Sequence, residues 1–153
     1  MSGVKILFYK ADGKLLDKLI RWWTNSKYSH CEILFENGLM YSADGWDSKG
    51  VRYTSQFNPE NWEVVPITLD DYKVKYLKMW CDDRVGKGYD WTGVLRFVVP
   101  ILPQLDEKWF CSELCGAALK YVGILSAEVD VHGLSPQDLY MHLLRIKAKS
   151  PLI

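Results

Sequence analysis

Hydrophobic and polar positions alternate along much of the first half of the chain, which is typical of β-strands with one buried face. The run VKILFY at 4–9 predicts a first strand, and YSHCEILF at 28–35 predicts another. Alternation in the strand at 28–35 separates two sets of side chains, Cys31, Ile33 and Phe35 toward a core and His30, Glu32 and Leu34 on the opposite face. An imidazole and a carboxylate are therefore expected side by side on one face of this strand.

Turn signals connect these strands to further elements. The Asn37-Gly38 pair favours a tight hairpin, so LMYSA at 39–43 is expected to pair antiparallel with the strand before it. Two more strands are predicted at 51–55 (VRYTS) and 62–67 (WEVVPI). Between the first two strands, apolar residues recur at helical spacing and predict an N-terminal helix with its basic residues elsewhere on the surface: Leu15, Leu16, Leu19, Ile20 and Trp23.

The second half of the chain has helical periodicity. Residues 69–85 begin with acids that suit a helix N-terminus, and this helix is expected to bury Tyr72, Tyr76 and Met79. A shorter helix is predicted after the break at 86–88, ending near Pro100 and followed by a loop.

Two more helices follow. One is predicted from Cys111 to about Gly123, and a last one at 134–144 has Ser135 as N-cap and Pro136 in its first turn. Strands first and helices second indicate an α+β fold with an antiparallel sheet.

Length and composition restrict the class of protein. The 153 residues suit a single domain spanning 1–153. Nineteen basic and nineteen acidic residues give zero formal net charge, so no nucleic-acid partner is expected, although the first thirty residues are locally basic.

The start of the chain lacks the long apolar stretch and cleavage site of a secretory signal, so a cytoplasmic location with free thiols is expected for the cysteines at 31, 81, 111 and 115. Because no segment approaches about 18 uninterrupted apolar residues, no transmembrane helix is predicted.

Cys111 lies where the helix in WFCSELCGAAL begins. At that position a thiol is surrounded by unpaired backbone N–H groups and the positive end of the helix dipole, and both favour the thiolate. The same N–H groups can hold an oxyanion during acyl transfer. Burial as an ordinary packing residue is the alternative interpretation.

A thiolate enzyme needs a base, and His30 is the candidate that the pattern offers. Glu32 lies two residues later on the same strand face, where it can orient the imidazole. Zinc is disfavoured, because neither His132 nor His142 has ligand-like spacing to a partner, and no cofactor is predicted. Trp22, Trp23, Tyr28 and Trp46 are candidates for the walls of a cleft.

Three segments in this order, SKYSHCEILFENGLMYSADG (26–45), WFCSELCGAAL (109–119) and LSPQDL (134–139), resemble the circularly permuted NlpC-type branch of papain-like cysteine hydrolases. The resemblance implies a permuted papain-like fold, an antiparallel sheet or partial barrel packed against helices, in which the His strand precedes the Cys helix. It implies Cys111 as nucleophile and His30 as base. It also implies that residues 15–26 line one wall of the cleft.

The family's third polar residue often lies on the strand after the histidine, where this chain has Ser42. Serine replaces a carboxylate or imidazole poorly in that role, so Glu32 is the first choice for the orienting residue and Asp44 the second.

The resemblance implies a cysteine peptidase or amidase that acts through a thioester acyl-enzyme, with a peptide or cell-wall peptide as substrate. Within the branch, the chain resembles small phage-encoded or bacterial members. A thioester-based acyltransferase that modifies lipids, and a catalytically inactive binding or virion module of the same fold, are the alternatives.

Overall fold

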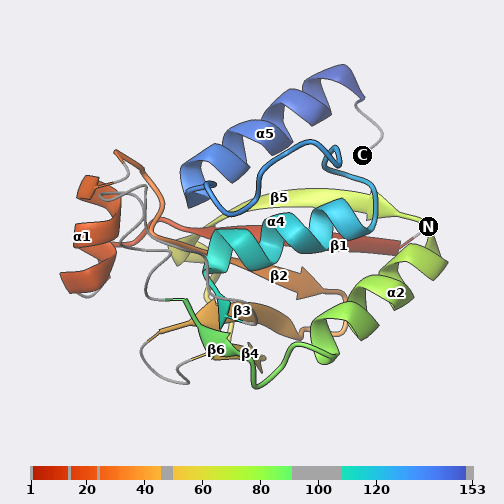
Figure 1. The fold of residues 1–153 in the computed structure, drawn as a ribbon, viewed down its shortest axis with the longest axis horizontal. Coiled ribbons are helices and arrows are strands. Elements are labelled where there is room, and N and C mark those ends of the chain that lie inside the picture. Colours follow the sequence, from red (N-terminus) through yellow and green to blue (C-terminus); the bar gives the residue numbers. More distant parts are fainter. Residues whose placement is uncertain (1, 14, 24, 46–49, 91–107, 151–153) are drawn as a thin grey trace.

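A computed structural model describes residues 2–13, 15–23, 25–45, 50–90 and 108–150. Within these ranges the chain is a mixed α+β fold in which a seven-stranded sheet is covered by helices on one face (Figure 1). The strands are β1 (Ser2–Tyr9), β2 (His30–Phe35), β3 (Met40–Asp44), β4 (Gly50–Thr54), β5 (Trp62–Leu69), β6 (Gly88–Tyr89) and β7 (Lys108–Trp109). The α-helices are α1 (Leu15–Trp23), α2 (Asp71–Asp82), α4 (Cys111–Tyr121) and α5 (Pro136–Lys149).

The sheet has the order β5-β1-β2-β3-β4-β6-β7, and its neighbours are antiparallel except for β6 and β7. The predicted α+β class with an antiparallel sheet is thus confirmed over the described ranges. The predicted hairpin is also confirmed, since Ile33 pairs with Tyr41 and Leu34 with Met40. Its turn contains Gly38 at φ 83°, a left-handed conformation that glycine adopts without a steric penalty.

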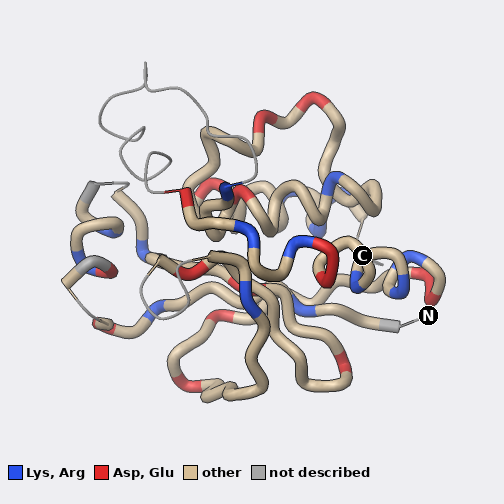
Figure 2. Tube along the Cα trace, turned by 60° about the horizontal axis from the view of Figure 1, so that its bottom comes forward, with Lys and Arg blue, Asp and Glu red and all other residues tan. Residues whose placement is uncertain are grey.

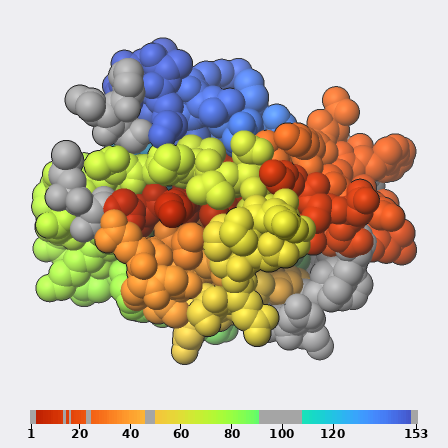
Figure 3. All heavy atoms as spheres, turned by 180° about the vertical axis from the view of Figure 1, so that it is seen from behind, coloured from red at the N-terminus to blue at the C-terminus, as the bar shows by residue number. Residues whose placement is uncertain are grey.

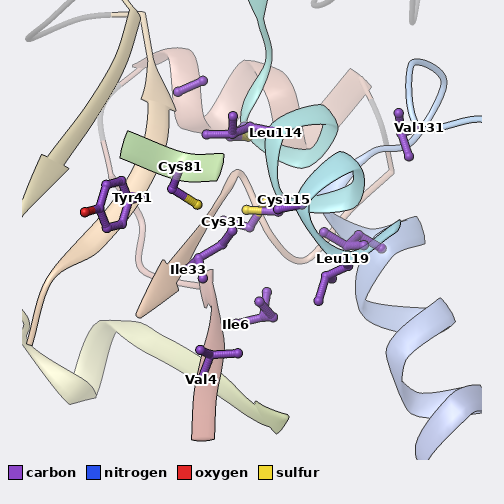
Figure 4. Packing of buried hydrophobic residues seen from close by; sticks show 14 of the residues in the cluster. Val4, Ile6, Cys31, Ile33, Tyr41, Cys81, Leu114, Cys115, Leu119 and Val131 are labelled. Carbon is purple, nitrogen blue, oxygen red and sulfur yellow. The ribbon is translucent and has the colours of Figure 1, made fainter. Parts of the chain in front are cut away.

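The main core lies between the sheet and helices α2, α4 and α5. The alternation predicted for β2 is confirmed, because Cys31, Ile33 and Phe35 are buried in this core. Leu114, Cys115, Ala118 and Leu119 give α4 a fully buried face that packs against β2 and β3. Figure 4 shows the labelled cysteines Cys31, Cys81 and Cys115 together within this packing. Seen from behind, atoms of β1, β2 and β5 lie at the surface, so the helices cover one face only (Figure 3).

The burial predicted for Tyr72, Tyr76 and Met79 in α2 is wrong. Tyr72, Tyr76 and Met79 are 57%, 51% and 55% exposed, whereas Leu77 and Cys81 are buried. The side of the helix that packs against β1 and α4 carries Leu77 and Cys81, with Val74 and Trp80 partly buried beside them.

α5 begins as predicted. The Ser135 hydroxyl accepts the backbone N–H of Asp138 at 3.1 Å, which caps the helix, and Pro136 occupies its first turn. The helix continues to Lys149, beyond the predicted end at residue 144. The helix predicted before Pro100 and most of the loop after it lie outside the described residues. Basic and acidic residues are interspersed along the trace (Figure 2).

Candidate active site

Cys111 is the first residue of α4, as the sequence predicts. The preceding residue, Phe110, is extended (φ −95°, ψ 155°), and its backbone N–H donates to Glu113 Oε2 at 3.2 Å. This contact fixes the helix start, so the first-turn N–H groups and the positive end of the dipole surround the cysteine.

Packing of α4 on β2 brings Cys111 to the beginning of that strand. There Cys111 interacts with His30 and with Cys31, and both neighbours lower the pKa of its thiol. The two residues predicted to form the catalytic pair therefore lie together, although they come from opposite parts of the chain.

Glu32 is the hydrogen-bond acceptor at the centre of the site. Its Oε1 atom lies 3.1 Å from His30 Nε2, 3.1 Å from the Ser42 hydroxyl and 3.3 Å from the Arg52 guanidinium. Its side chain is only 3% exposed. Because Nε2 of His30 faces Glu32, Nδ1 is the nitrogen left for Cys111. This is the geometry of an orienting carboxylate.

Arg52 is a site residue that the sequence analysis missed. It bridges two of the candidates for the third position, donating from Nε to Asp44 at 3.0 Å and from its terminal nitrogen to Glu32. The pairing of Ser42 with Arg52 in adjacent strands brings it there. The arginine in the predicted strand VRYTS could have indicated a cation near the site if the pairing of β3 with β4 had been known. The register that places Arg52 opposite Ser42 cannot be read from the sequence.

The ionisation of the three candidate residues is coupled. Burial alone would raise the pKa of Cys111, but hydrogen bonds with Cys31 and His30 and the charge on His30 lower it to about 5. Burial alone would lower the pKa of His30, but Cys111 and Glu32 raise it well above its ordinary value. Burial opposes ionisation of Glu32, yet His30, Arg52 and Ser42 lower its pKa below the usual range. At pH values above about 5 and below the raised pKa of His30, Cys111 is a thiolate and His30 is an imidazolium.

Cys31 is a second residue whose role the sequence did not reveal. It was assigned to the core, and it is fully buried. Its thiol also interacts with Cys111 and Cys115. Burial is the main cause that raises the pKa of Cys31 well above its ordinary value, and these two neighbours raise it further. Cys31 thus stays protonated and donates to the Cys111 thiolate.

Replacing Cys31 with alanine is expected to raise the pKa of Cys111. A hydrogen bond to a charged group contributes about 1.5–3 kcal/mol, so the midpoint of ionisation should rise by about one to two pH units. The readout is the pH dependence of iodoacetamide alkylation of the Cys111 peptide, followed by mass spectrometry. Cys81→Ala is the matched control, because Cys81 is equally buried and is no hydrogen-bond partner of Cys111. An unchanged midpoint in Cys31→Ala would show that the thiol donor contributes nothing.

A cavity of about 320 Å³ opens beside the pair. His30, Glu32, Asp44 and Arg52 lie in its wall, and Asp17 and Ile20 contribute the α1 side. Cys111 is 1% exposed and is not a wall residue, so its sulfur is not exposed in this cavity.

Among the described residues, the aromatic side chains in the cavity wall are Tyr9, Trp62 and Tyr89, none of which the sequence pattern indicates. Tyr28 is instead buried between Phe8 and Tyr140, and Trp22 is 77% exposed. The Trp23 side chain and Trp46 lie outside the described part.

A second Glu–His pair supports the helix that carries Cys111. Glu113, which is 2% exposed, hydrogen-bonds Nδ1 of His132. Burial raises the pKa of Glu113, against the opposing effects of His132 and the Phe110 N–H. His132 lies in a turn as expected, but its contact with Glu113 was not anticipated. Among the described residues, no group of three or more His, Cys, Asp or Glu could hold a metal ion.

The chain matches no protein-family model, and no curated protein matches it significantly in sequence. Over the described part of the chain, none of the helices has the length and apolar character needed to cross a bilayer.

Proposed function

We propose that the protein is a cysteine hydrolase of the permuted papain-like type, with Cys111 as nucleophile, His30 as general acid and base, and Glu32 as orienting residue. The observation that carries the proposal is the chain of contacts from Cys111 to His30 and from His30 Nε2 to Glu32 Oε1 at 3.1 Å. The order of the two elements supports the permuted arrangement, since the His strand β2 precedes the Cys helix α4.

In this mechanism the Cys111 thiolate attacks the carbonyl carbon of an amide or ester. N–H groups in the first turn of α4 stabilise the oxygen anion of the tetrahedral intermediate. The His30 imidazolium gives its proton to the leaving amine or alcohol, and the carbon–heteroatom bond breaks to leave a thioester. Neutral His30 then takes a proton from water, whose oxygen attacks the thioester and releases the acid and Cys111.

The environment of the pair supports this chemistry at neutral pH. The pKa of Cys111 is about 5 and that of His30 is raised, so the thiolate and the imidazolium are both present at pH values between these two pKa values. Glu32, itself held by Arg52 and Ser42, keeps the ring in place and stabilises the imidazolium.

The proposed substrate is a peptide or isopeptide, including peptides of bacterial cell walls. The cavity wall combines the polar residues Glu32, Asp44 and Arg52 with the rings of Tyr9 and Trp62. Such a mixture suits a peptide side chain that carries both polar and apolar atoms.

A second candidate is a catalytically inactive binding module of the same fold. The burial of Cys111 behind the cavity wall is the observation that favours it. A thiol that no reagent reaches in the folded protein cannot form an acyl-enzyme.

Alkylation by iodoacetamide separates the two candidates. For a hydrolase, Cys111 of the intact protein is labelled before the other three cysteines, and about as fast at pH 6 as at pH 8, because the thiolate is already formed at both. The labelled residue is identified by peptide mass spectrometry. Labelling of Cys111 only upon unfolding would reject the hydrolase and favour the binding module.

An acyl-transfer assay tests the reaction itself. Incubation with 4-nitrophenyl acetate should give a burst of nitrophenol and an acetyl group on Cys111, and Cys111→Ala should give neither. Adding glycine ethyl ester as acceptor distinguishes hydrolysis from transfer, because an acyltransferase would form the acetylated amine in place of acetate.

A further inference from the structure

Helix α1 presents its apolar residues to solvent. Leu15, Leu19 and Trp22 follow one another at a spacing of four and three residues, so they form one line along the helix, here named the α1 stripe. These side chains are 82%, 42% and 77% exposed. Helical spacing alone does not distinguish these exposed positions from Ile20, which is buried.

Specific contacts hold the helix in this orientation. Ile20, on the inner face, is 5% exposed and lies in the cavity wall with Asp17. The guanidinium of Arg21 donates to the backbone oxygen of Asp12 at 2.8 Å and to that of Lys10 at 3.4 Å. Turning the stripe inward would break these contacts, so its exposure is a property of the folded helix.

The surroundings of the α1 stripe are basic. Lys18 lies beside it on the same helix and is exposed. Lys10 and Lys27 are exposed in the flanking segments, and Lys10 lies 3.9 Å from the carboxylate of Glu63. The acids of this part of the chain are Asp12 and Asp17, and Asp17 lies on the inner face in the cavity wall. A local excess of positive charge around exposed Leu and Trp, in a chain of zero net charge, is complementary to an anionic apolar surface.

Tryptophan and lysine have different preferred depths in such a surface. Trp side chains favour the boundary between headgroups and acyl chains, and Lys side chains extend toward anionic headgroups. A nine-residue helix lying flat can place Leu15, Leu19 and Trp22 below the headgroups while Lys18 stays at their level.

We propose that the α1 stripe docks the protein on the surface of an anionic lipid bilayer. The opposite side of the same helix contributes to the cavity next to His30, so docking through the stripe keeps that cavity close to the bilayer surface. The interaction is independent of the proposed hydrolase chemistry, and its test needs no substrate.

The test is co-sedimentation of the full chain with vesicles of phosphatidylcholine and phosphatidylglycerol in roughly equal amounts. The wild-type protein is expected to sediment with these vesicles, less with phosphatidylcholine alone, and less at high salt. The double variant Leu15→Glu/Trp22→Glu should bind about tenfold more weakly or worse, since it removes two exposed apolar side chains and adds two negative charges.

The matched control is Tyr76→Glu/Met79→Glu on α2. This variant adds the same charge and removes two side chains that are 51% and 55% exposed. In Figures 1 and 3, α1 and α2 lie at opposite ends of the molecule, so the control should bind vesicles almost as well as wild type. Circular dichroism verifies that both variants fold.

Three outcomes would overturn the proposal. One is a wild-type protein that stays in the supernatant with anionic vesicles. Another is equal binding by wild type and the α1 variant, or a loss confined to the α2 variant, either of which would place the contact elsewhere. The third is a wild-type dimer without vesicles that the α1 variant converts to a monomer, which would assign the stripe to a second copy of the chain.

Discussion

Replacing His30 with alanine is expected to remove the charge that keeps Cys111 ionised. Burial would then dominate, and the pKa of Cys111 should rise from about 5 to the ordinary thiol range near 8.5 or above. At about pH 6 the thiolate fraction falls by roughly three-hundredfold, but each remaining thiolate is more nucleophilic. Alkylation at that pH should therefore slow by about fivefold to tenfold.

The shape of the pH profile is the sharper measurement for this variant. In the wild type, alkylation of Cys111 should be nearly flat above pH 6 and decline as the pH falls through about 5. In His30→Ala it should rise steadily with pH up to the ordinary thiol range. Hydrolysis of 4-nitrophenyl acetate should fall by about a hundredfold to ten-thousandfold, because general acid–base catalysis is lost with the imidazole.

His142→Ala is the control, since this histidine lies on α5 away from the pair. It should leave both profiles unchanged. If His30→Ala retained a thiolate at pH 6, another group would have to ionise Cys111, and the assignment of His30 would fail.

Replacing Glu32 with leucine is expected to be the most destabilising single change at the site. Leucine has a similar size but accepts no hydrogen bond, so Arg52, Ser42 and His30 lose a common acceptor in a nearly closed environment. Removing one member of a buried ion pair costs about 3–5 kcal/mol, and the partial exposure of Arg52 places the expected loss near the lower end. Urea unfolding followed by circular dichroism measures it.

The controls for Glu32→Leu use the same sheet. Glu63→Leu on β5 removes a partly exposed carboxylate whose nearest cation, Lys10, is 3.9 Å away, and should cost less than about 1 kcal/mol. In Glu32→Leu the Arg52 guanidinium keeps its ion pair with Asp44 at 3.0 Å, so the double variant Glu32→Leu/Arg52→Met, which also removes that pair, should be less stable than Glu32→Leu alone. Equal stability of Glu32→Leu and wild type would contradict the central role of Glu32.

The stability that Glu32→Leu loses depends on pH in a definite direction. The pKa of Glu32 is lowered on folding, so its contribution to stability is complete above its ordinary value of about 4.5 and disappears as the pH falls through the lower folded value. The stability difference between wild type and Glu32→Leu should accordingly narrow in acid.

Local signals in the sequence predicted the elements that carry the site. The start of α4 at Cys111, the cap at Ser135 and the turn at Asn37-Gly38 all depend on neighbouring residues, and all three are confirmed. The alternation in β2 also placed His30 next to Glu32 correctly.

What the sequence could not predict depends on contacts between distant segments. Arg52 reaches Glu32 through the register of β3 and β4, and Cys31 meets Cys111 through the packing of α4 on β2. For a related reason, the sequence could not predict which faces of α1 and α2 are buried. Each helix has more apolar positions than one buried face accepts. Only the shape of the neighbouring elements decides which positions face the solvent.

The position of β1 between β5 and β2 affects the order in which the chain can fold. β1 pairs with β2 and also with β5, so the second edge of β1 stays unpaired until residues 62–69 have been synthesised. Closure of so long a loop is slow compared with formation of a local hairpin. A nascent chain that ends before Cys111 holds His30 without its sulfur partner, and the pair can form only late in synthesis, when α4 has left the ribosome.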